Sequence, residues 1–332
     1  MIRASVDLMG GDWAPEVILK AAANFHDVHF VFVGDASVKE KIAEYGISNY
    51  SFVESGYVLQ EGKKVSKQDL ERSSLYFAIN QVKEKRADFV ISGGSSGYYL
   101  LLCRQLLGTI GSISRPAITA TIPTQKGVAI MLDLGANITC SDDDLVKFAI
   151  MGASLAQFWL NVQVPKVGFI NVGSESGKGP EFVRSAAAKF QAIHPEFYGG
   201  FAEGNDTMNG DFDVLVVDGF AGNCMLKFGE GLSVLFKTMF KNAFKNGILN
   251  KIALFLLGNR LKRVFIDPRR YNGAIFAGIN GCAIKSHGGS DEVGFRYALE
   301  FGIKIAKNND NLLEKMSADF EKLGKISHLE QN

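Results

Sequence analysis

Residues 212–231 have the sequence FDVLVVDGFAGNCMLKFGEG. They begin with a dense apolar run, Val214–Val217, which is typical of a buried strand. The residues that follow are Asp218, Gly219, Gly222 and Asn223. Glycine permits a sharp turn with positive φ, and the first N–H groups of a following helix can bind an anion. The stretch therefore predicts a strand, a turn and a helix, with an anion-binding site at the carboxyl end of a parallel strand.

Two further loops have the same design. The first is SGGSSG, Ser92–Gly97, which follows an apolar run and offers glycine N–H groups and hydroxyls without negative charge. We predict that this loop binds phosphate; the alternative is an ordinary loop of small residues. The expected ligands are Ser92, Gly94, Ser95, Ser96 and Gly97.

The second loop is GSESGKG, residues 173–179. It is similar to a P-loop, but it has one residue too few before Gly177 and no Ser or Thr after Lys178. We therefore do not expect it to bind ATP. Lys178, next to Gly179, can still offer a point charge to an anion. A solvated surface lysine is the alternative.

Strands and helices alternate along the chain, with polar loops between them. Apolar runs predict strands at 3–9, 29–33, 89–91, 167–172, 214–217 and 278–284, and a hairpin at 117–134. The alternation predicts an α/β fold in three layers, Rossmann-like, with a mainly parallel sheet. Because ligands of such folds bind at the carboxyl ends of strands, we expect the three loops to line one shared cleft. Residues 1–332 are taken as one domain, with a helical hairpin protruding at about 232–265 and a charged tail after 308.

The bulk composition excludes several classes of protein. Of the 332 residues, 47% are apolar, and 36 Lys and Arg balance 35 Asp and Glu, so no overall charge favours nucleic acid. The N-terminus carries charge too early for a signal peptide, and no uninterrupted apolar run is long enough to cross a membrane. We therefore expect a cytoplasmic protein. Four widely spaced cysteines are expected to be reduced core thiols: Cys103, Cys140, Cys224 and Cys282.

The sequence indicates neither a metal nor a nucleotide cofactor. Its histidines lack metal-ligand spacing. No GxGxxG lies between a strand and a helix, which disfavours a nicotinamide enzyme. His287 lies in the polar segment KSHGGSD after the last predicted strand, and it is a candidate acid, base or hydrogen-bond donor.

The predicted hairpin is both apolar and basic. Lysines at four-residue spacing, Lys237, Lys241 and Lys245, flank an apolar helix face, and an apolar segment follows at 252–257. The densest basic cluster comes next: Arg260, Lys262, Arg263, Arg269 and Arg270. Such a surface is either buried in a partner or in contact with lipid, and the sequence leaves both open.

Together, these motifs resemble one family. In chain order they are MGGDWAPE (9–16), ISGGSSG (91–97), RPAITATIPT (115–124), LDLGAN (132–137), FAIMG (148–152), VGFINVGSESGKG (167–179), VVDGFAGN (216–223) and INGCAIKSHGGSD (279–291). Their order and spacing are similar to those of the bacterial, PlsX-type phosphate acyltransferases of phospholipid synthesis, from residue 2 to about residue 306. One departure is the phosphate loop, where the family usually has SAGNTGA. Ser95 and Ser96 replace the Asn and Thr, and bulky Tyr98 follows.

The resemblance implies a fold similar to the isocitrate and isopropylmalate dehydrogenases. It also implies transfer of a fatty acyl group from acyl carrier protein to inorganic phosphate, giving an acyl phosphate that feeds a glycerol-3-phosphate acyltransferase. The resemblance further implies a homodimer, peripheral contact with the inner membrane, and the absence of a metal or nucleotide. Because acyl carrier proteins are acidic, the basic cluster is the expected docking site.

The residues can be fitted to this implied reaction. Phosphate is already a competent nucleophile, so the enzyme needs alignment and preorganised donors for the oxyanion. We assign phosphate to the Ser92–Gly97 loop and Lys178, and the thioester end to Asp218, Gly219, Gly222 and Asn223. Asn223 is the expected oxyanion donor, with His287 a further catalytic candidate. The residues expected to line the cleft are Asp7, Gly10, Gly11, Asp12, Asn137, Gly179, His287 and Asp291.

Two alternative functions stay open. One is another enzyme of the same fold, a phosphotransacetylase or a decarboxylating dehydrogenase; the latter needs a cluster of metal-binding aspartates and a nicotinamide loop. The other is a non-catalytic scaffold on the membrane surface that recruits enzymes of lipid synthesis through the basic hairpin.

Overall fold

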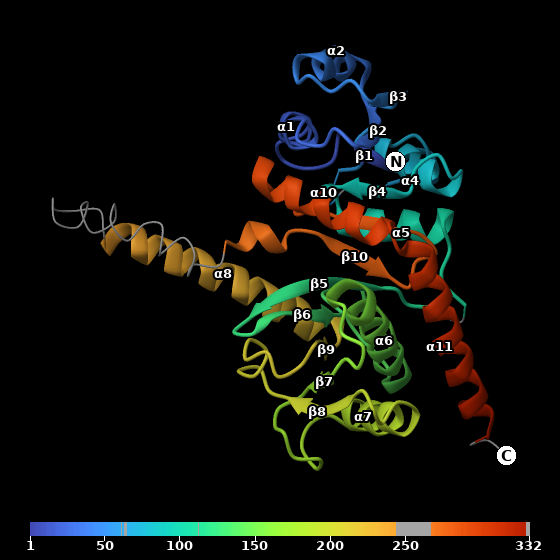
Figure 1. Cartoon of the computed structure of the whole chain (residues 1–332), viewed down its shortest axis with the longest axis vertical. Helices are drawn as coiled ribbons and strands as arrows, with labels where there is room; N and C mark the ends of the chain where they lie inside the picture. Colours follow the sequence, from blue (N-terminus) through green and yellow to red (C-terminus); the bar gives the residue numbers. More distant parts are fainter. Residues whose placement is uncertain (61, 63–64, 112, 244–266, 330–332) are drawn as a thin grey trace.

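An eleven-stranded sheet runs through the molecule (Figure 1). The computed structural model describes residues 1–60, 62, 65–111, 113–243 and 267–329. The strands are β1 (Ile2–Asp7), β2 (Val28–Gly34), β3 (Tyr50–Glu54), β4 (Phe89–Ser92), β5 (Ala117–Thr124), β6 (Gly127–Leu132), β7 (Val167–Ile170), β8 (Tyr198–Ala202), β9 (Val214–Val216), β10 (Ala274–Ala277) and β11 (Ala283–Lys285). Their order across the sheet is β3-β2-β1-β4-β11-β10-β5-β6-β9-β7-β8.

The sheet consists of two parallel blocks that run in opposite directions. One block is β3, β2, β1, β4 and β11, and the other is β6, β9, β7 and β8. Between them, β10 is antiparallel to β11 and to β5, and β5 is antiparallel to β6. The predicted α/β fold, its mainly parallel sheet and its hairpin at 117–134 are therefore confirmed.

Helices cover both faces of the sheet and complete three layers (Figure 1). The helices are α1 (Glu16–Ala22), α2 (Ala36–Glu44), α3 (Lys67–Glu71), α4 (Ser74–Lys83), α5 (Ser96–Leu106), α6 (Asp142–Leu155), α7 (Glu181–Ile193), α8 (Gly219–Ala243), α10 (Glu292–Ala306) and α11 (Asn309–Leu329). A π-helical turn, η1 (Ala156–Leu160), extends α6, and a 3₁₀ turn, η2 (Pro268–Tyr271), precedes β10.

Strand β9 illustrates how the layers are held together. Val214 and Val216 pack in the core that α1, α6, α7 and α10 share, whereas Leu215 packs with Met225 and Leu226 of α8 on the opposite face. All three strand residues are buried, as expected for a parallel strand covered on both sides. The dense apolar run of the sequence thus reflects two buried faces.

The chain departs from the predicted strands near its C-terminal end. Instead of one strand at 278–284, it forms β10 and β11 as an antiparallel pair. Gly278 has a φ of +89°, so β10 ends at Ala277 and the chain turns back at Gly278. The short strands β3 and β8 were not predicted either, because each has several half-exposed residues and no dense apolar run.

Helix α8 leaves the body of the protein (Figure 1). Its first turns pack on the sheet through Met225 and Leu226, whereas Phe228 is 73% exposed, and Val234 and Leu235 are exposed as well. Cys224 is also exposed on this helix, so the prediction that all four cysteines lie in the core is wrong for Cys224. The rest of the predicted hairpin, 244–265, lies outside the described residues.

Candidate active site

Asp7 and Ser92 lie at the centre of a buried polar group. We call it the Ser92 cluster: the carboxyl ends of β1, β4 and β11 and the loops 8–12, 93–97 and 286–291 that follow them. The Ser92 hydroxyl donates to Asp7 Oδ2 over 2.7 Å and accepts from Gly94 N–H at 3.0 Å. Burial raises the pKa of the Asp7 carboxyl, while hydrogen bonds from Ser92, Ser74 and Met9 lower it. These bonds hold the Ser92 hydroxyl in one orientation.

In this cluster, the backbone of the 8–12 loop packs directly against the backbone of the 93–97 loop. A Cβ on Gly10 would lie 2.4 Å from Ser92 Oγ and 2.7 Å from Gly94 N, and a Cβ on Gly93 would lie 2.8 Å from Gly10 O. No side chain larger than hydrogen fits at either position without moving backbone. The glycines therefore serve the close approach of two loops that end neighbouring strands.

Helix α5 begins inside this cluster. Ser95 is its N-cap residue, with extended-type ψ, but the Ser95 side chain makes no capping hydrogen bond. The Ser96 and Gly97 N–H groups are therefore not capped by the Ser95 side chain and are suited to an anion. The predicted phosphate ligands Ser92, Gly94, Ser95, Ser96 and Gly97 thus lie together on one strand-to-helix connection.

Lys285 brings a positive charge to the same loops and was not predicted. It pairs in register with Ser92 across β11 and β4, and its ammonium lies 3.2 Å from Gly93 O and also contacts the Ser286 carbonyl. The signal in the sequence was a lone lysine directly after a buried strand.

His287 lies in the loop after β11, as predicted, and is exposed. The Gly289 N–H donates to His287 Nδ1 over 3.1 Å, so the neutral ring carries its proton on Nε2. The same loop is joined to the N-terminal loop by the Asp12 N–H, which donates to Gly288 O at 2.9 Å. The arrangement therefore favours His287 as a hydrogen-bond donor through Nε2.

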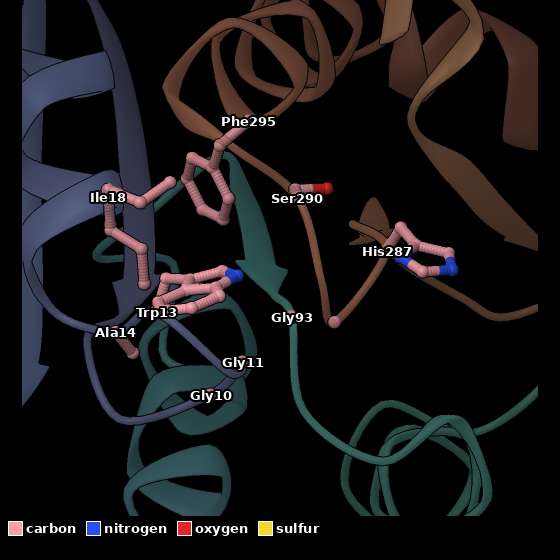
Figure 2. Close-up of a pocket in the computed structure, with 11 residues that line it drawn as sticks. Gly10, Gly11, Trp13, Ala14, Ile18, Gly93, His287, Ser290 and Phe295 are labelled. Carbon is pink, nitrogen blue, oxygen red and sulfur yellow. The ribbon is translucent and has the colours of Figure 1, made fainter. Parts of the chain in front are cut away.

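A small pocket opens beside these loops, with one polar and one apolar wall (Figure 2). The polar wall is backbone of loops 10–11 and 93 with Ser290, and the apolar wall is Trp13, Ile18 and Phe295. Trp13 is 64% exposed at the mouth of the pocket. Figure 2 shows the Trp13 ring between Ile18 and Gly11, while the His287 ring points away from it. The pocket thus brings backbone polar groups of two loops next to an apolar surface.

A second group of predicted residues surrounds Asp133, which ends β6. We call it the Asp133 cluster: residues 133–137 with 217–223. The buried Asp133 carboxylate accepts from the backbone N–H groups of Ile118, Gly135, Ala136 and Asn137 and from the Asn137 amide. Asn137 O accepts from Gly219 N–H, and a Cβ on Gly222 would lie 1.9 Å from Asp133 O. Asp133 thus organises the loop on which the start of α8 rests.

Asp218 caps helix α8 with its own side chain. The N–H groups of Phe220 and Ala221 donate to Asp218 Oδ1, each over 3.0 Å. The anion-binding site predicted from residues 212–231 is therefore wrong at this helix start, because the chain supplies its own carboxylate there. Asn223 is exposed one turn further on, near Gly135.

The third predicted loop, 173–179, follows β7. The buried Asn171 amide donates to Gly173 O and Lys178 O and so holds both ends of the loop, and Gly179 has a φ of +89°. Lys178 forms an exposed ion pair with Glu175 at 2.8 Å. A neighbouring carboxylate offsets the charge that we had assigned to phosphate.

The strand directions separate these groups. The Ser92 cluster follows strands of the first block, whereas the Asp133 cluster and the 173–179 loop follow β6, β9 and β7 of the second block. Because β10 and β5 reverse the direction between the blocks, the two sets follow strands that run in opposite directions. That all three loops line one shared cleft stays a prediction.

Two of the predicted docking residues are described. Arg269 and Arg270 lie on η2, where Arg269 forms ion pairs with Asp267 at 2.6 Å and with Asp291 at 2.9 Å. Asp291 in turn caps α10 by accepting from Gly294 N–H. Arg260, Lys262 and Arg263 lie outside the described residues.

In the described parts of the chain, no group of three or more His, Cys, Asp or Glu side chains is placed to hold a metal ion. Likewise, none of the helices in those parts combines the length and the apolar character needed to cross a membrane.

The fold and the Ser92 cluster define an α/β protein with an anion-suited loop at the carboxyl ends of parallel strands. Solved structures of the same fold include a phosphotransacetylase from Streptococcus pyogenes, with a TM-score of 0.65 and 17% identity over 92% of this chain and 94% of that one. A 4-hydroxythreonine-4-phosphate dehydrogenase from Salmonella typhimurium has a TM-score of 0.56 at 12% identity, over 92% and 99%. The predicted dehydrogenase-like fold is confirmed.

Residues 2–312 match the model of the family described as fatty acid synthesis protein. Among similar proteins, the phosphate acyltransferase of Rhodospirillum rubrum is 40% identical over 92% of this chain and 91% of its own length. That of Paramagnetospirillum magneticum is 35% identical over 97% and 95%. The chain therefore belongs to the phosphate acyltransferase family, which confirms the resemblance found in the sequence and makes it a transferase.

Proposed function

We propose that the protein transfers a fatty acyl group from acyl carrier protein to inorganic phosphate at the Ser92 cluster. One observation carries this proposal. The Lys285 ammonium lies next to the hydroxyl-rich loop 92–97, where α5 begins without a side-chain cap. A cation, hydroxyls and helix N–H groups together match the charge and the acceptor oxygens of a phosphate.

The reaction needs no activated side chain. A phosphate oxygen attacks the thioester carbonyl, a C–O bond forms, the C–S bond breaks, and the phosphate proton passes to the departing thiolate. The chain must hold phosphate in line with the carbonyl and stabilise the oxyanion. We assign phosphate to Lys285 and the loop 93–97, which the buried Ser92 hydroxyl holds through the Gly94 N–H, and oxyanion stabilisation to His287 Nε2–H.

The roles predicted for Asn223 and Lys178 become the rival assignment, because both residues follow strands of the second block, Asn223 after β9 and Lys178 after β7. Asn223→Ala and His287→Ala separate the two. The assignment above expects His287→Ala to lower turnover about 100-fold and Asn223→Ala to leave it within about threefold. The reverse order would return the oxyanion role to Asn223.

The proposal includes the partners implied by the family resemblance. Exposed apolar side chains on α8, among them Phe228, Val234 and Leu235, support a surface covered by a second copy of the chain and approaching the inner membrane. A downstream glycerol-3-phosphate acyltransferase would consume the acyl phosphate. Sedimentation tests the homodimer, and flotation with anionic liposomes tests the membrane contact.

The function is tested by mixing protein, acyl carrier protein loaded with a fatty acyl group, and phosphate, and trapping acyl phosphate with hydroxylamine. We expect a hydroxamate that depends on phosphate and is lost with Ser92→Ala. Activity with acetyl coenzyme A alone would favour a phosphotransacetylase, and binding of a nicotinamide dinucleotide would favour a dehydrogenase. Liposome binding without hydroxamate would favour the scaffold.

A further inference from the structure

The side chain of Asn272 lies at the centre of a hydrogen-bond network behind the His287 loop. Its Oδ1 accepts from the His287 N–H at 2.9 Å. Its Nδ2 lies 2.9 Å from Ser286 Oγ, 2.9 Å from Ser290 Oγ and 2.8 Å from Gly294 O, so its two hydrogens serve three acceptors and one of them is shared. One amide at the end of η2 thus contacts both ends of the 286–290 loop and the first turn of α10.

The network requires an amide. The His287 N–H is an obligate donor and Gly294 O an obligate acceptor, so the group between them needs a carbonyl oxygen on one side and N–H donors on the other. Aspartate has nearly the same shape but offers only acceptors when ionised, so it would place a carboxylate oxygen against Gly294 O.

The loop that Asn272 holds is part of the Ser92 cluster. Ser286 N–H donates to Ser92 O at 3.0 Å, Gly288 O accepts from Asp12 N–H, and Lys285 directly precedes the loop. A shift of the loop therefore moves the His287 ring and the Lys285 ammonium relative to Ser92. Asn272 itself does not line the pocket.

We propose that Asn272 is a positioning residue for acyl transfer. Its amide fixes the 286–290 loop, and with it His287 and Ser290, relative to Ser92 and the loop 93–97. This inference rests on the proposed function of that cluster. The Arg269–Asp291 ion pair, 2.9 Å long, joins η2 to the start of α10 at a second point. The turn η2 and the loop are thus held to the same helix.

The test uses Asn272→Asp in the full-length protein, with Asn24→Asp as the matched control. Asn24 also donates from its amide to helix carbonyls, those of Lys20 and Ala21, but it lies just beyond the C-terminal end of α1, whereas the loop 8–12 precedes that helix. We expect kcat/KM for phosphate to fall about 100-fold in Asn272→Asp, because misplacement by a fraction of a bond length costs alignment, and to stay within about twofold in the control.

A double-mutant cycle with His287→Ala distinguishes positioning from general destabilisation. If Asn272 acts through His287, its substitution costs less than about threefold once His287 is alanine. An equal loss in both backgrounds, or unchanged kcat/KM in Asn272→Asp, would overturn the proposal. If Asn272→Asp does not fold, Asn272→Gln, which keeps the amide but displaces it, replaces it in the cycle.

Hydrogen exchange separates this inference from the proposed function. We expect the amides of 286–290 to exchange faster in Asn272→Asp than in the wild type, with strands β6 and β9 unchanged. If the wild type forms no hydroxamate but the loop loses protection, the function fails while the structural role of Asn272 stands. Unchanged protection of the loop would refute the role of Asn272 whatever the activity.

Discussion

Ser92 donates its hydroxyl proton to Asp7 over 2.7 Å, and both side chains are fully enclosed by the protein. A buried carboxyl whose pKa is raised makes stability depend on pH. Because the ionised form is disfavoured in the folded state, the free energy of unfolding falls as the pH rises through the folded pKa of Asp7.

Asp7→Asn should remove this pH dependence. The variant cannot ionise, so its unfolding free energy relative to the wild type should increase as the pH rises above about 4, the ordinary range of an Asp carboxyl. Urea denaturation over this range measures the difference. Asp27→Asn, on the exposed surface, is the control, and parallel curves for Asp7→Asn and the wild type would contradict the argument.

Lys285→Gln should raise the KM for phosphate about 10- to 100-fold, the effect of losing a hydrogen bond from a charged donor. Lys178→Gln should change it less than about twofold, because Lys178 sits in an exposed pair with Glu175. Initial rates against phosphate concentration measure both. A larger effect at Lys178 would mean that Lys178, as predicted from the sequence, supplies the positive charge that binds phosphate.

Two glycines of α8 form a matched pair for stability. Gly222→Ala places a methyl group 1.9 Å from Asp133 O and should lower the free energy of unfolding by about 1–3 kcal/mol. A Cβ on Gly229 would meet nothing within 4 Å, so Gly229→Ala should raise the free energy of unfolding by about 1 kcal/mol through helix propensity. Thermal unfolding of both variants decides, and an equal shift in both would mean that the contact with Asp133 does not matter.

Arg270→Glu should raise the KM for acyl groups carried on acyl carrier protein and leave the phosphate KM unchanged. Arg270 is exposed on η2, whereas Arg269 already pairs with Asp267 and Asp291, so Arg270 is the cleaner test of docking. The effect should shrink as salt screens the charges. Arg104→Glu, an exposed charge reversal on α5, is the control; a similar change there would remove the case for a local docking site.

The sequence predicted elements better than it predicted how they meet. Apolar periodicity located β1, β4, β7 and β9, but periodicity carries no information on strand direction, so the reversal at β10 and β5 was not foreseen. The loop at 92–97 was predicted because glycines and hydroxyls directly after an apolar run are typical of a strand-to-helix connection that binds an anion.

Residues that act through distant partners were missed. Asn272 contacts residues 14 to 22 positions further along the chain, and nothing in its own neighbourhood marks it. Lys285 resembled any solvated lysine. Asp218 could have been interpreted as a helix cap, since aspartate before a helix commonly is one.

The central pair β10 and β11 also bears on how the protein is made. Until residues 274–285 leave the ribosome, the nascent chain contains two incomplete half-sheets, and the sides of β4 and β5 that later pair with these strands are open. Unpaired strand edges are sites of intermolecular association. The last strands to be synthesised, β10 and β11, thus join the two half-sheets and cover the open sides of β4 and β5. Ribosome-bound chains that end before residue 274 should therefore be more prone to aggregation and proteolysis than chains that include β11.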